Sequence, residues 1–154
     1  MSGMYGMNIK MAIYGESHGA SIGLVIDGVP PGLKLDLEAI EKEMARRAPG
    51  KNQLSTQRKE SDSFAIQSGF FEGYTTGTPL CVVIKNSDQH SKDYSILKDK
   101  MRPGHADYAG FVRYQGFNDY RGGGHFSGRL TAPLVFIGAV AKQALAQEGI
   151  LVGA

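Results

Sequence analysis

The chain has 154 residues, of which 42% are hydrophobic and 21% are charged, so it can bury the core of one domain and is neither disordered nor fibrous. A net charge of +2 is too small to indicate a nucleic-acid partner, and a single cysteine excludes a disulfide framework. The sequence has no apolar run close to the roughly 20 residues of a membrane helix and no secretory signal pattern. We therefore expect a cytoplasmic protein that binds neither membrane nor nucleic acid.

The first third of the chain predicts two strands and a helix. Residues 10–14 and 21–27 read as short strands, joined by the glycine-bounded polar turn Gly15-Glu-Ser-His-Gly19. A helix is expected next, N-capped by Asp36 and ending near Ala48, because apolar residues recur on one helical face. The residues on this face are Leu37, Ile40 and Met44.

The middle of the chain predicts two more strands, at residues 65–71 and 80–85, with a turn between them. Residues 86–105 are polar and read as a loop. A short helix is expected after His105. Together with the first strands, this order favours an α+β domain.

A second long helix is predicted near the end of the sequence, capped by Thr131 or Ala132 and extending to Glu148, with Gly149 as its stop. It is apolar over most of its surface, which is typical of a core helix. Residues 150–152 then begin a strand pattern and the sequence stops. We therefore expect residues 1–154 to be the N-terminal part of a longer domain.

Two short motifs suggest other classes of protein. Gly15-Glu-Ser-His-Gly19 fits the nucleophile elbow of serine hydrolases, but that elbow requires a helix after the serine and a strand is expected here. A serine hydrolase using Ser17 remains the alternative function. The segment Arg121-Gly-Gly-Gly-His-Phe-Ser-Gly-Arg129 has the glycine spacing of a P-loop without its Lys-Ser/Thr ending. The four histidines lack the spacing of metal ligands, so no metal is predicted.

Two histidines are candidates for acid–base chemistry. His18 lies between glycines in a polar turn, where it is either a catalytic imidazole or an ordinary surface or satisfied core histidine. His105 follows a Pro-Gly turn and lies between Arg102 and Asp107. These two neighbours suit either an imidazole beside an anionic ligand or a capped turn before a helix.

Basic residues and glycines supply the remaining candidates. A basic run follows the first helix and is either solvated surface or a binding site for a small anionic substrate. Gly122-Gly-Gly124 precedes the second helix and is either a flexible connection or a phosphate-binding backbone, so a non-catalytic phosphate-binding module also stays open. The residues of the basic run are Arg46, Arg47, Lys51, Arg58 and Lys59.

Taken together, five segments resemble the chorismate synthase family in their order and spacing. They cover nearly the whole chain, and their combination is specific where each alone is weak. The segments are Tyr14-Gly-Glu-Ser-His-Gly19, Asp27-Gly-Val-Pro-Pro-Gly32, Arg46-Arg-Ala-Pro-Gly50 with Ser55-Thr-Gln-Arg58, Arg102-Pro-Gly-His-Ala-Asp-Tyr108, and Arg121-Gly-Gly-Gly-His-Phe-Ser-Gly-Arg-Leu-Thr-Ala132.

The resemblance implies a β-α-β sandwich of α+β class, here incomplete, in a homotetramer. It implies a lyase of the shikimate pathway of aromatic amino-acid biosynthesis. The reaction is the anti-1,4-elimination of phosphate and the C6 hydrogen from 5-enolpyruvylshikimate 3-phosphate, which gives chorismate. Reduced FMN is required without net oxidation, and NADPH is a possible reductant. By this resemblance, residues 1–154 alone are expected to be inactive.

The resemblance also implies roles for a flavin-side group of residues. His18 corresponds to the family histidine that protonates or hydrogen-bonds the reduced flavin. Ser17 and Ser127 correspond to serines that support the flavin and its neighbours. His125 and Phe126, with Ser127, stand where many members have Arg-Ser-Ser, and are expected to contact the cofactor.

A second implied group lies on the substrate side. His105 corresponds to the histidine near the departing phosphate. Arg47, Arg102 and Arg129 correspond to residues that bind the substrate anions, and Arg46 is expected to assist. A substrate with one phosphate and two carboxylates needs several cations, which is consistent with this set.

Overall fold

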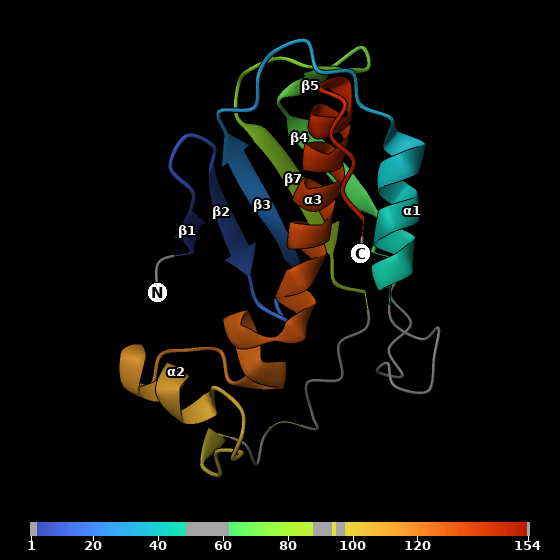
Figure 1. The fold of residues 1–154 in the computed structure, drawn as a ribbon. Coiled ribbons are helices and arrows are strands. Elements are labelled where there is room, and N and C mark those ends of the chain that lie inside the picture. Colours follow the sequence, from blue (N-terminus) through green and yellow to red (C-terminus); the bar gives the residue numbers. More distant parts are fainter. Residues whose placement is uncertain (1–2, 49–61, 88–93, 95–97, 154) are drawn as a thin grey trace.

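The computed structural model describes residues 3–48, 62–87, 94 and 98–153, and its centre is an antiparallel five-stranded sheet (Figure 1). The strand order is β1-β2-β3-β7-β4, so the two strands at the centre, β3 and β7, are far apart in the sequence. This sheet with its helices confirms the α+β class. The strands are β1 (Met4–Tyr5), β2 (Lys10–Gly15), β3 (Ser21–Asp27), β4 (Phe64–Ser68) and β7 (Leu80–Lys85).

Strict alternation of side chains places one apolar face of β3 and β7 in the core. Ile22, Leu24 and Ile26 are fully buried, and the register sets them opposite Ile84, Val82 and Leu80 of β7. Because successive residues of a strand point to opposite faces, this pairing stacks six aliphatic side chains on one side of the sheet. The predicted strands 10–14, 21–27 and 80–85 are thereby confirmed.

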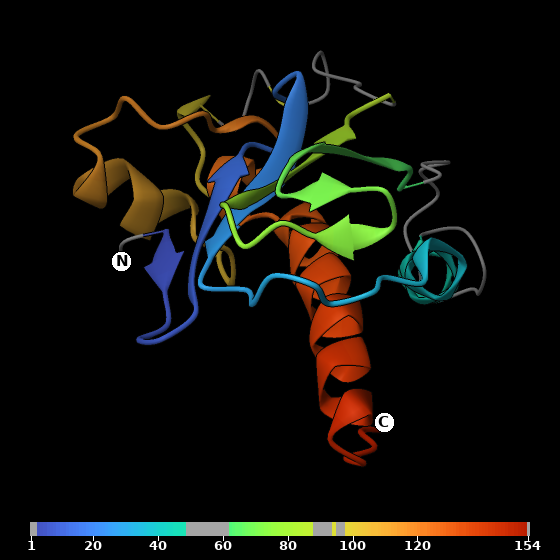
Figure 2. The same cartoon turned by 90° about the horizontal axis from the view of Figure 1, so that it is seen from above.

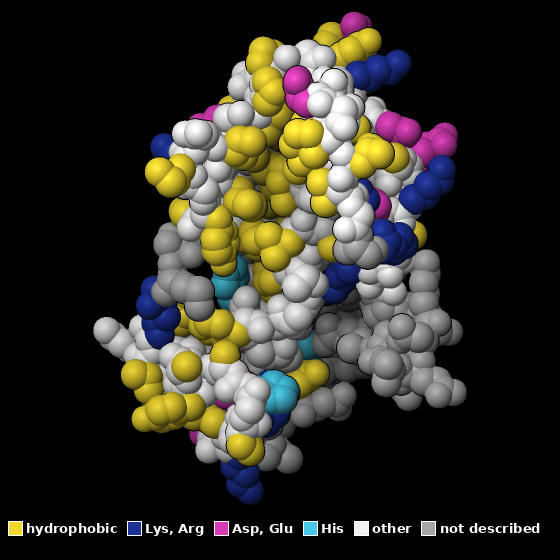
Figure 3. All heavy atoms as spheres, viewed as in Figure 1, with side chains coloured by type: hydrophobic (Ala, Val, Ile, Leu, Met, Phe, Trp, Pro, Cys, Tyr) yellow, Lys and Arg dark blue, Asp and Glu magenta, His cyan; other side chains and the backbone are white. Residues whose placement is uncertain are grey.

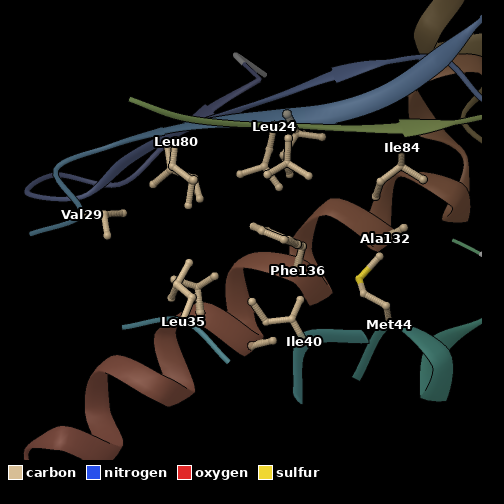
Figure 4. Packing of buried hydrophobic residues seen from close by; sticks show 14 of the residues in the cluster. Leu24, Val29, Leu35, Ile40, Met44, Leu80, Ile84, Ala132 and Phe136 are labelled. Atoms are coloured by element: carbon tan, nitrogen blue, oxygen red, sulfur yellow. The ribbon is translucent and has the colours of Figure 1, made fainter. Parts of the chain in front are cut away.

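Two helices, α1 (Leu37–Arg47) and α3 (Thr131–Gln147), cover that face (Figures 1 and 2). Figure 4 shows Phe136 of α3 between the sheet residue Leu24 and Ile40 of α1. The Asp36 carboxylate accepts a hydrogen bond from the Ala39 amide at 3.0 Å, which confirms the predicted N-cap. The five-stranded sheet and these two helices therefore form one sheet layer and one helix layer.

Helix α3 begins differently from the prediction. Its N-cap is Leu130 rather than Thr131 or Ala132, because the 3₁₀ turn η3 (Gly128–Leu130) leads directly into it. The capping side chain is Ser127, whose Oγ accepts a hydrogen bond from the Arg129 amide. The helical stretch Arg121–Gln147 is long and apolar enough to cross a membrane by length and composition alone, but its buried residues pack on the sheet as in a core helix.

Two strand predictions are corrected. The expected strand at residues 65–71 is divided at Gly69, where φ is +79° and a Cβ would lie 2.5 Å from the Leu80 Cα. The chain after it forms a separate hairpin of β5 (Phe70–Phe71) and β6 (Tyr74–Thr75). Residues 150–153, all of them described, are irregular, and the Ile150 amide donates to the Leu145 carbonyl at 3.0 Å. The strand predicted at 150–152 is therefore wrong for this structure.

Residues 98–126 form a lobe beyond one end of the sheet (Figure 1). It contains α2 (Asp107–Arg113), which confirms the helix expected after His105, and the 3₁₀ segment η2 (Arg121–Phe126). Hydrophobic side chains gather on this α2 lobe in the space-filling view (Figure 3). Several are exposed: Tyr108, Phe111, Val112, Tyr114 and Phe117.

Candidate functional site

The turn between β2 and β3 holds Ser17 and His18 in a buried position. Only 1% of Ser17 and 2% of His18 is exposed, although both side chains are polar. Ser17 Oγ lies 3.0 Å from His18 Nδ1, and the ring of Tyr94 meets the imidazole edge-on at 4.8 Å between centroids. Burying two polar side chains costs free energy unless they are hydrogen-bonded. The contacts that the surrounding residues make with this turn therefore determine the geometry of Ser17 and His18.

The glycines of η2 form a roof over this turn. Gly122, Gly123 and Gly124 have φ values of +58°, +83° and +54°, in the left-handed region that glycine adopts without strain. A Cβ on Gly122 would lie 2.5 Å from His18 Nδ1 and 2.7 Å from Ser17 Oγ. The run that could have been a flexible connection is therefore a close backbone contact that only glycine permits.

Hydrogen bonds fix the roof to the turn. The Ser17 amide donates to the Gly124 carbonyl at 3.1 Å, and His125 Nδ1 lies 2.8 Å from the Gly15 carbonyl oxygen. The conformation of η2 and the placement of His18 are thus one structural unit.

Asn86, just after β7, holds the same turn from the other side. Its Nδ2 donates to the carbonyls of Glu16 at 3.0 Å and Gly19 at 2.8 Å. Its Oδ1 accepts from Arg129 Nε at 3.1 Å. One amide side chain therefore connects the Ser17–His18 turn to an arginine predicted to bind substrate.

Arg47 and Arg129 meet at a buried carboxylate, Asp62. Arg47 Nη1 donates to Asp62 Oδ2 and Arg129 Nη1 donates to Asp62 Oδ1. Arg129 is 5% exposed at its side chain and Arg47 is 20% exposed. Two predicted substrate-binding residues are thus brought together from α1 and η3.

His105 and Arg102 lie on the turn that leads into α2. The Asp107 carboxylate accepts from Arg102 Nε at 2.9 Å, Nη2 at 3.0 Å and the backbone amide at 3.0 Å. These hydrogen bonds hold the pKa of Asp107 below its ordinary value and raise the pKa of the Arg102 guanidinium. His105 is exposed, and its amide donates to the Arg102 carbonyl at 3.4 Å.

The lowered pKa of Asp107 predicts acid sensitivity of this turn. A depressed carboxyl pKa contributes stability that is complete above the unfolded value, about pH 4, and is lost as pH falls through the folded value. We expect Asp107→Asn to lower the free energy of unfolding by about 1 kcal/mol at pH 6, after allowance for partial exposure, and by less at pH 3. Denaturant unfolding at both pH values measures this difference.

The matched control for that experiment is Glu41→Gln, an exposed carboxylate on α1. Its effect on unfolding is expected to be below about 0.5 kcal/mol at either pH. If Asp107→Asn lowers the free energy of unfolding equally at pH 3 and pH 6, the lost stability does not come from the Arg102–Asp107 ion pair.

A cavity of about 420 Å³ lies beside the roof, between η2 and the loop after α2. His125 and Phe126 line it together with the aromatic residues Tyr114 and Phe117. Phe117 is 89% exposed, so the cavity has an open aromatic wall. Two of the three residues predicted to contact a cofactor therefore lie at a concave surface large enough for part of a planar ring.

Ser127 lies beside the roof, 4.0 Å from the position of a Cβ on Gly123, but neither Ser127 nor Arg46 lines this cavity. Ser127 caps η3, as described above, and Arg46 pairs with Glu43 at 2.8 Å on the exposed side of α1. Arg46 is therefore separate from the cluster of Arg47, Asp62 and Arg129. The predicted basic residues Lys51, Arg58 and Lys59 lie outside the described residues, as do Pro49-Gly50, Ser55-Thr-Gln-Arg58 and His90.

Sequence reasoning missed Asp62 and Asn86. Both stand in polar runs next to a strand, where no periodic pattern distinguishes them from their neighbours. Asp62 has a φ of +51°, a conformation that Asp tolerates better than most side chains, but φ is not readable from sequence. The sequence therefore contains no local signal that singles out either residue.

The geometry does not match a nucleophile elbow or a metal centre. β3 begins at Ser21, so a strand follows the serine turn, as expected, where a nucleophile elbow requires a helix. Within residues 3–48, 62–87, 94 and 98–153, no group of three or more His, Cys, Asp or Glu side chains is arranged to hold a metal ion. The arrangement is instead a buried histidine beside arginines held by carboxylates.

Comparison with known proteins gives a consistent picture. A family model described as chorismate synthase matches residues 9–154. The curated chorismate synthase of Pyrococcus abyssi is 51% identical over 153 residues, which are 98% of this chain and 42% of that protein. The chorismate synthase of Sulfurimonas denitrificans is 53% identical over 146 residues, which are 95% of this chain and 40% of that protein. The chain thus spans about two fifths of the length of these relatives.

A solved structure agrees with the sequence relatives. A crystal structure of chorismate synthase superposes with a TM-score of 0.67 at 31% identity. The superposition covers 96% of this chain and 36% of that one. The sheet and helix layers described above are therefore a known arrangement for this part of such a chain.

Proposed function

Because the chain belongs to the chorismate synthase family, we propose that the protein carrying it eliminates phosphate and the C6 hydrogen from 5-enolpyruvylshikimate 3-phosphate to give chorismate. In this elimination the C3–O bond to phosphate and the C6–H bond break, and a new double bond forms in the ring. We propose a cytoplasmic homotetramer with reduced FMN, and NADPH as a possible reductant.

The observation that supports this proposal is the convergence of the family's segments. The buried Ser17–His18 turn, the glycine roof and the Arg102 turn come from three distant parts of the chain. Arg102 Nη2 lies 3.9 Å from the position of a Cβ on Gly123, so a guanidinium lies beside the roof. A histidine and a cation held next to an open glycine backbone suit an anionic substrate.

The residues present fit one wall of a flavin site. The aromatic cavity beside His125 and Phe126 could hold part of a planar ring system. Its lining includes the carboxylates Glu16 and Asp119, which disfavour an anionic phosphate at that point. When bound, reduced FMN would supply an electron that is recovered within the turnover, so no net oxidation occurs.

The chain's own residues then have separate tasks. His18 would exchange a proton with the bound cofactor, and Ser17 Oγ, 3.0 Å from His18 Nδ1, would orient the imidazole. Arg102, oriented by Asp107, and the neighbouring His105 would hold the phosphate as it departs. Arg47 and Arg129 would supply positive charge for the remaining anionic groups.

The test is chorismate formation by the protein as its gene encodes it, with reduced FMN and 5-enolpyruvylshikimate 3-phosphate. We expect activity in the unmodified protein and a loss of about 100-fold in kcat for His105→Ala, the size usual for an acid–base group. Absorbance of chorismate measures the rate. Absence of chorismate from the unmodified protein would refute the proposed function.

A further inference from the structure

Asp62 is the residue on which the two arginines of the cluster depend. It lies just before β4, and its side chain is fully buried. Burial of an ionised carboxylate is strongly unfavourable unless cations and hydrogen bonds satisfy it. Each oxygen of Asp62 accepts from a different guanidinium, so the two arginines satisfy both of its oxygens.

The dependence also holds in the other direction. Arg47 comes from the last turn of α1 and Arg129 from η3, and without a shared anion two guanidiniums at this distance repel each other. Two cations with one carboxylate leave one net positive charge in the cluster. The carboxylate therefore permits two arginines to share a site and leaves attraction for a further anion.

The two arginines are not equivalent. All three guanidinium nitrogens of Arg129 donate to protein acceptors: Asn86 Oδ1, Asp62 and the Lys85 carbonyl. Arg47 is more exposed, and two of its contacts, to Thr131 Oγ1 at 3.3 Å and to the Gly128 carbonyl at 3.5 Å, are long. Arg47 is thus the member that can turn toward a ligand, and Arg129 is the fixed one.

The backbone of Asp62 supports a specific placement. Its φ of +51° is uncommon for a residue with a side chain, and such a conformation persists where the surrounding contacts determine it. In this conformation the Asp62 carboxylate lies between Arg47 of α1 and Arg129 of η3.

We propose that Asp62 is a positioning residue, which orients Arg47 for a phosphate or carboxylate group of the substrate while Arg129 braces it. This inference rests on the proposed function, because it takes the ligand of Arg47 to be the anionic substrate. Asp62 itself contacts no reacting atom. Asp62 affects substrate binding by fixing the orientation and position of the Arg47 guanidinium.

The experiment uses Asp62→Asn in the protein as its gene encodes it, with KM and kcat measured separately. A misdirected Arg47 weakens substrate binding, so we expect KM to rise about 10-fold and kcat to change less than about 2-fold. A merely structural role would reduce the amount of folded enzyme, lowering the apparent kcat with KM unchanged. That second pattern would overturn the inference.

The matched control is Glu43→Gln. It makes the same carboxylate-to-amide change on α1, one turn before Arg47, and removes contacts to Arg46 at 2.8 Å and Lys142 at 2.7 Å. We expect its KM to stay within about 2-fold of the unmodified protein.

A double-mutant cycle with Arg47→Ala tests the route of the effect. If Asp62 acts through Arg47, Asp62→Asn should raise KM less than about 2-fold further once Arg47 is absent. An unchanged 10-fold rise in that background would overturn the inference. If Asp62→Asn does not fold, Asp62→Glu replaces it in the test, since this change keeps the charge but moves the carboxylate by one methylene. An unchanged KM in Asp62→Glu would also overturn the inference.

The two possible failures are distinguishable. An active protein in which Arg47→Ala raises KM but Asp62→Asn does not would refute the role of Asp62 and leave the proposed function intact. A protein that makes no chorismate at all would refute the proposed function, and the inference with it.

Discussion

If the proposed function holds, Gly122→Ala in the protein as its gene encodes it is expected to lower chorismate formation about 1,000-fold and the free energy of unfolding by about 3 kcal/mol. The added methyl group would lie 2.5 Å from His18 Nδ1 and 2.7 Å from Ser17 Oγ, and the residue would keep a φ of +58°. Either the imidazole and hydroxyl move together or the roof lifts from the turn. Activity assays with denaturant unfolding measure both consequences.

Gly128→Ala is the matched control for the roof. Gly128 belongs to the same glycine-rich segment, but a Cβ there would meet no atom within 4 Å, and its φ does not lie in the left-handed region. We expect activity within about 3-fold and stability within about 0.5 kcal/mol of the unmodified protein. Equal losses in the two variants would show that the segment, rather than its contact with His18, is sensitive.

Asn86→Ala is expected to lower the free energy of unfolding by about 3 kcal/mol and activity about 100-fold. The change removes two hydrogen bonds to the carbonyls of the Ser17–His18 turn and one from Arg129 Nε. Groups that stay buried without partners carry most of that cost. Hydrogen exchange of the turn's amides, compared before and after the change, measures the loosening directly.

Ser87→Ala serves as the control for Asn86, because it is the next residue along the chain and is exposed. It should leave hydrogen exchange of residues 16–19 and chorismate formation unchanged. If Asn86→Ala also left that exchange unchanged, the amide side chain would not be what holds the turn.

Local patterns were enough to predict most regular elements. Alternation at residues 21–27 and a continuous apolar run at residues 80–84 identified the two central strands, and one face of each is fully buried. Asp36 followed by an apolar face of period 3.6 identified α1 and its start. These features are local, so the sequence contains them without knowledge of partners.

The elements that were mispredicted depend on distant contacts. The strand at 65–71 is interrupted because Gly69 fits against the backbone of Leu80, a neighbour known only once β7 is in place. The α3 cap was misplaced because Ser127 begins a 3₁₀ turn that continues into the helix, and apolar periodicity does not reveal such a turn. Two-residue β1 is too short for any pattern.

The same distinction holds in the candidate site. His18, His105 and the arginines were identified through resemblance, because spacing alone left each with an ordinary structural explanation. Asp62 and Asn86 were missed because their contacts to Arg129 cross 67 and 43 residues. Asp62 and Asn86 matter because each connects residues that are far apart in the sequence. A single sequence does not show which distant residues are in contact.

The distance along the chain between the histidine turn and its roof has a consequence for synthesis on the ribosome. The Gly15–His125 contact spans 110 residues, so at about 5–20 residues per second the turn is made about 5–20 s before its cover. In the first part of that interval, until residues 80–85 are made, β3 also lacks β7, and its isoleucines and leucine are open to aggregation. The turn itself, Glu16-Ser-His18, is polar and is well solvated while it is uncovered. In the nascent chain, the hazard lies in the strand and not in the segment that becomes the site.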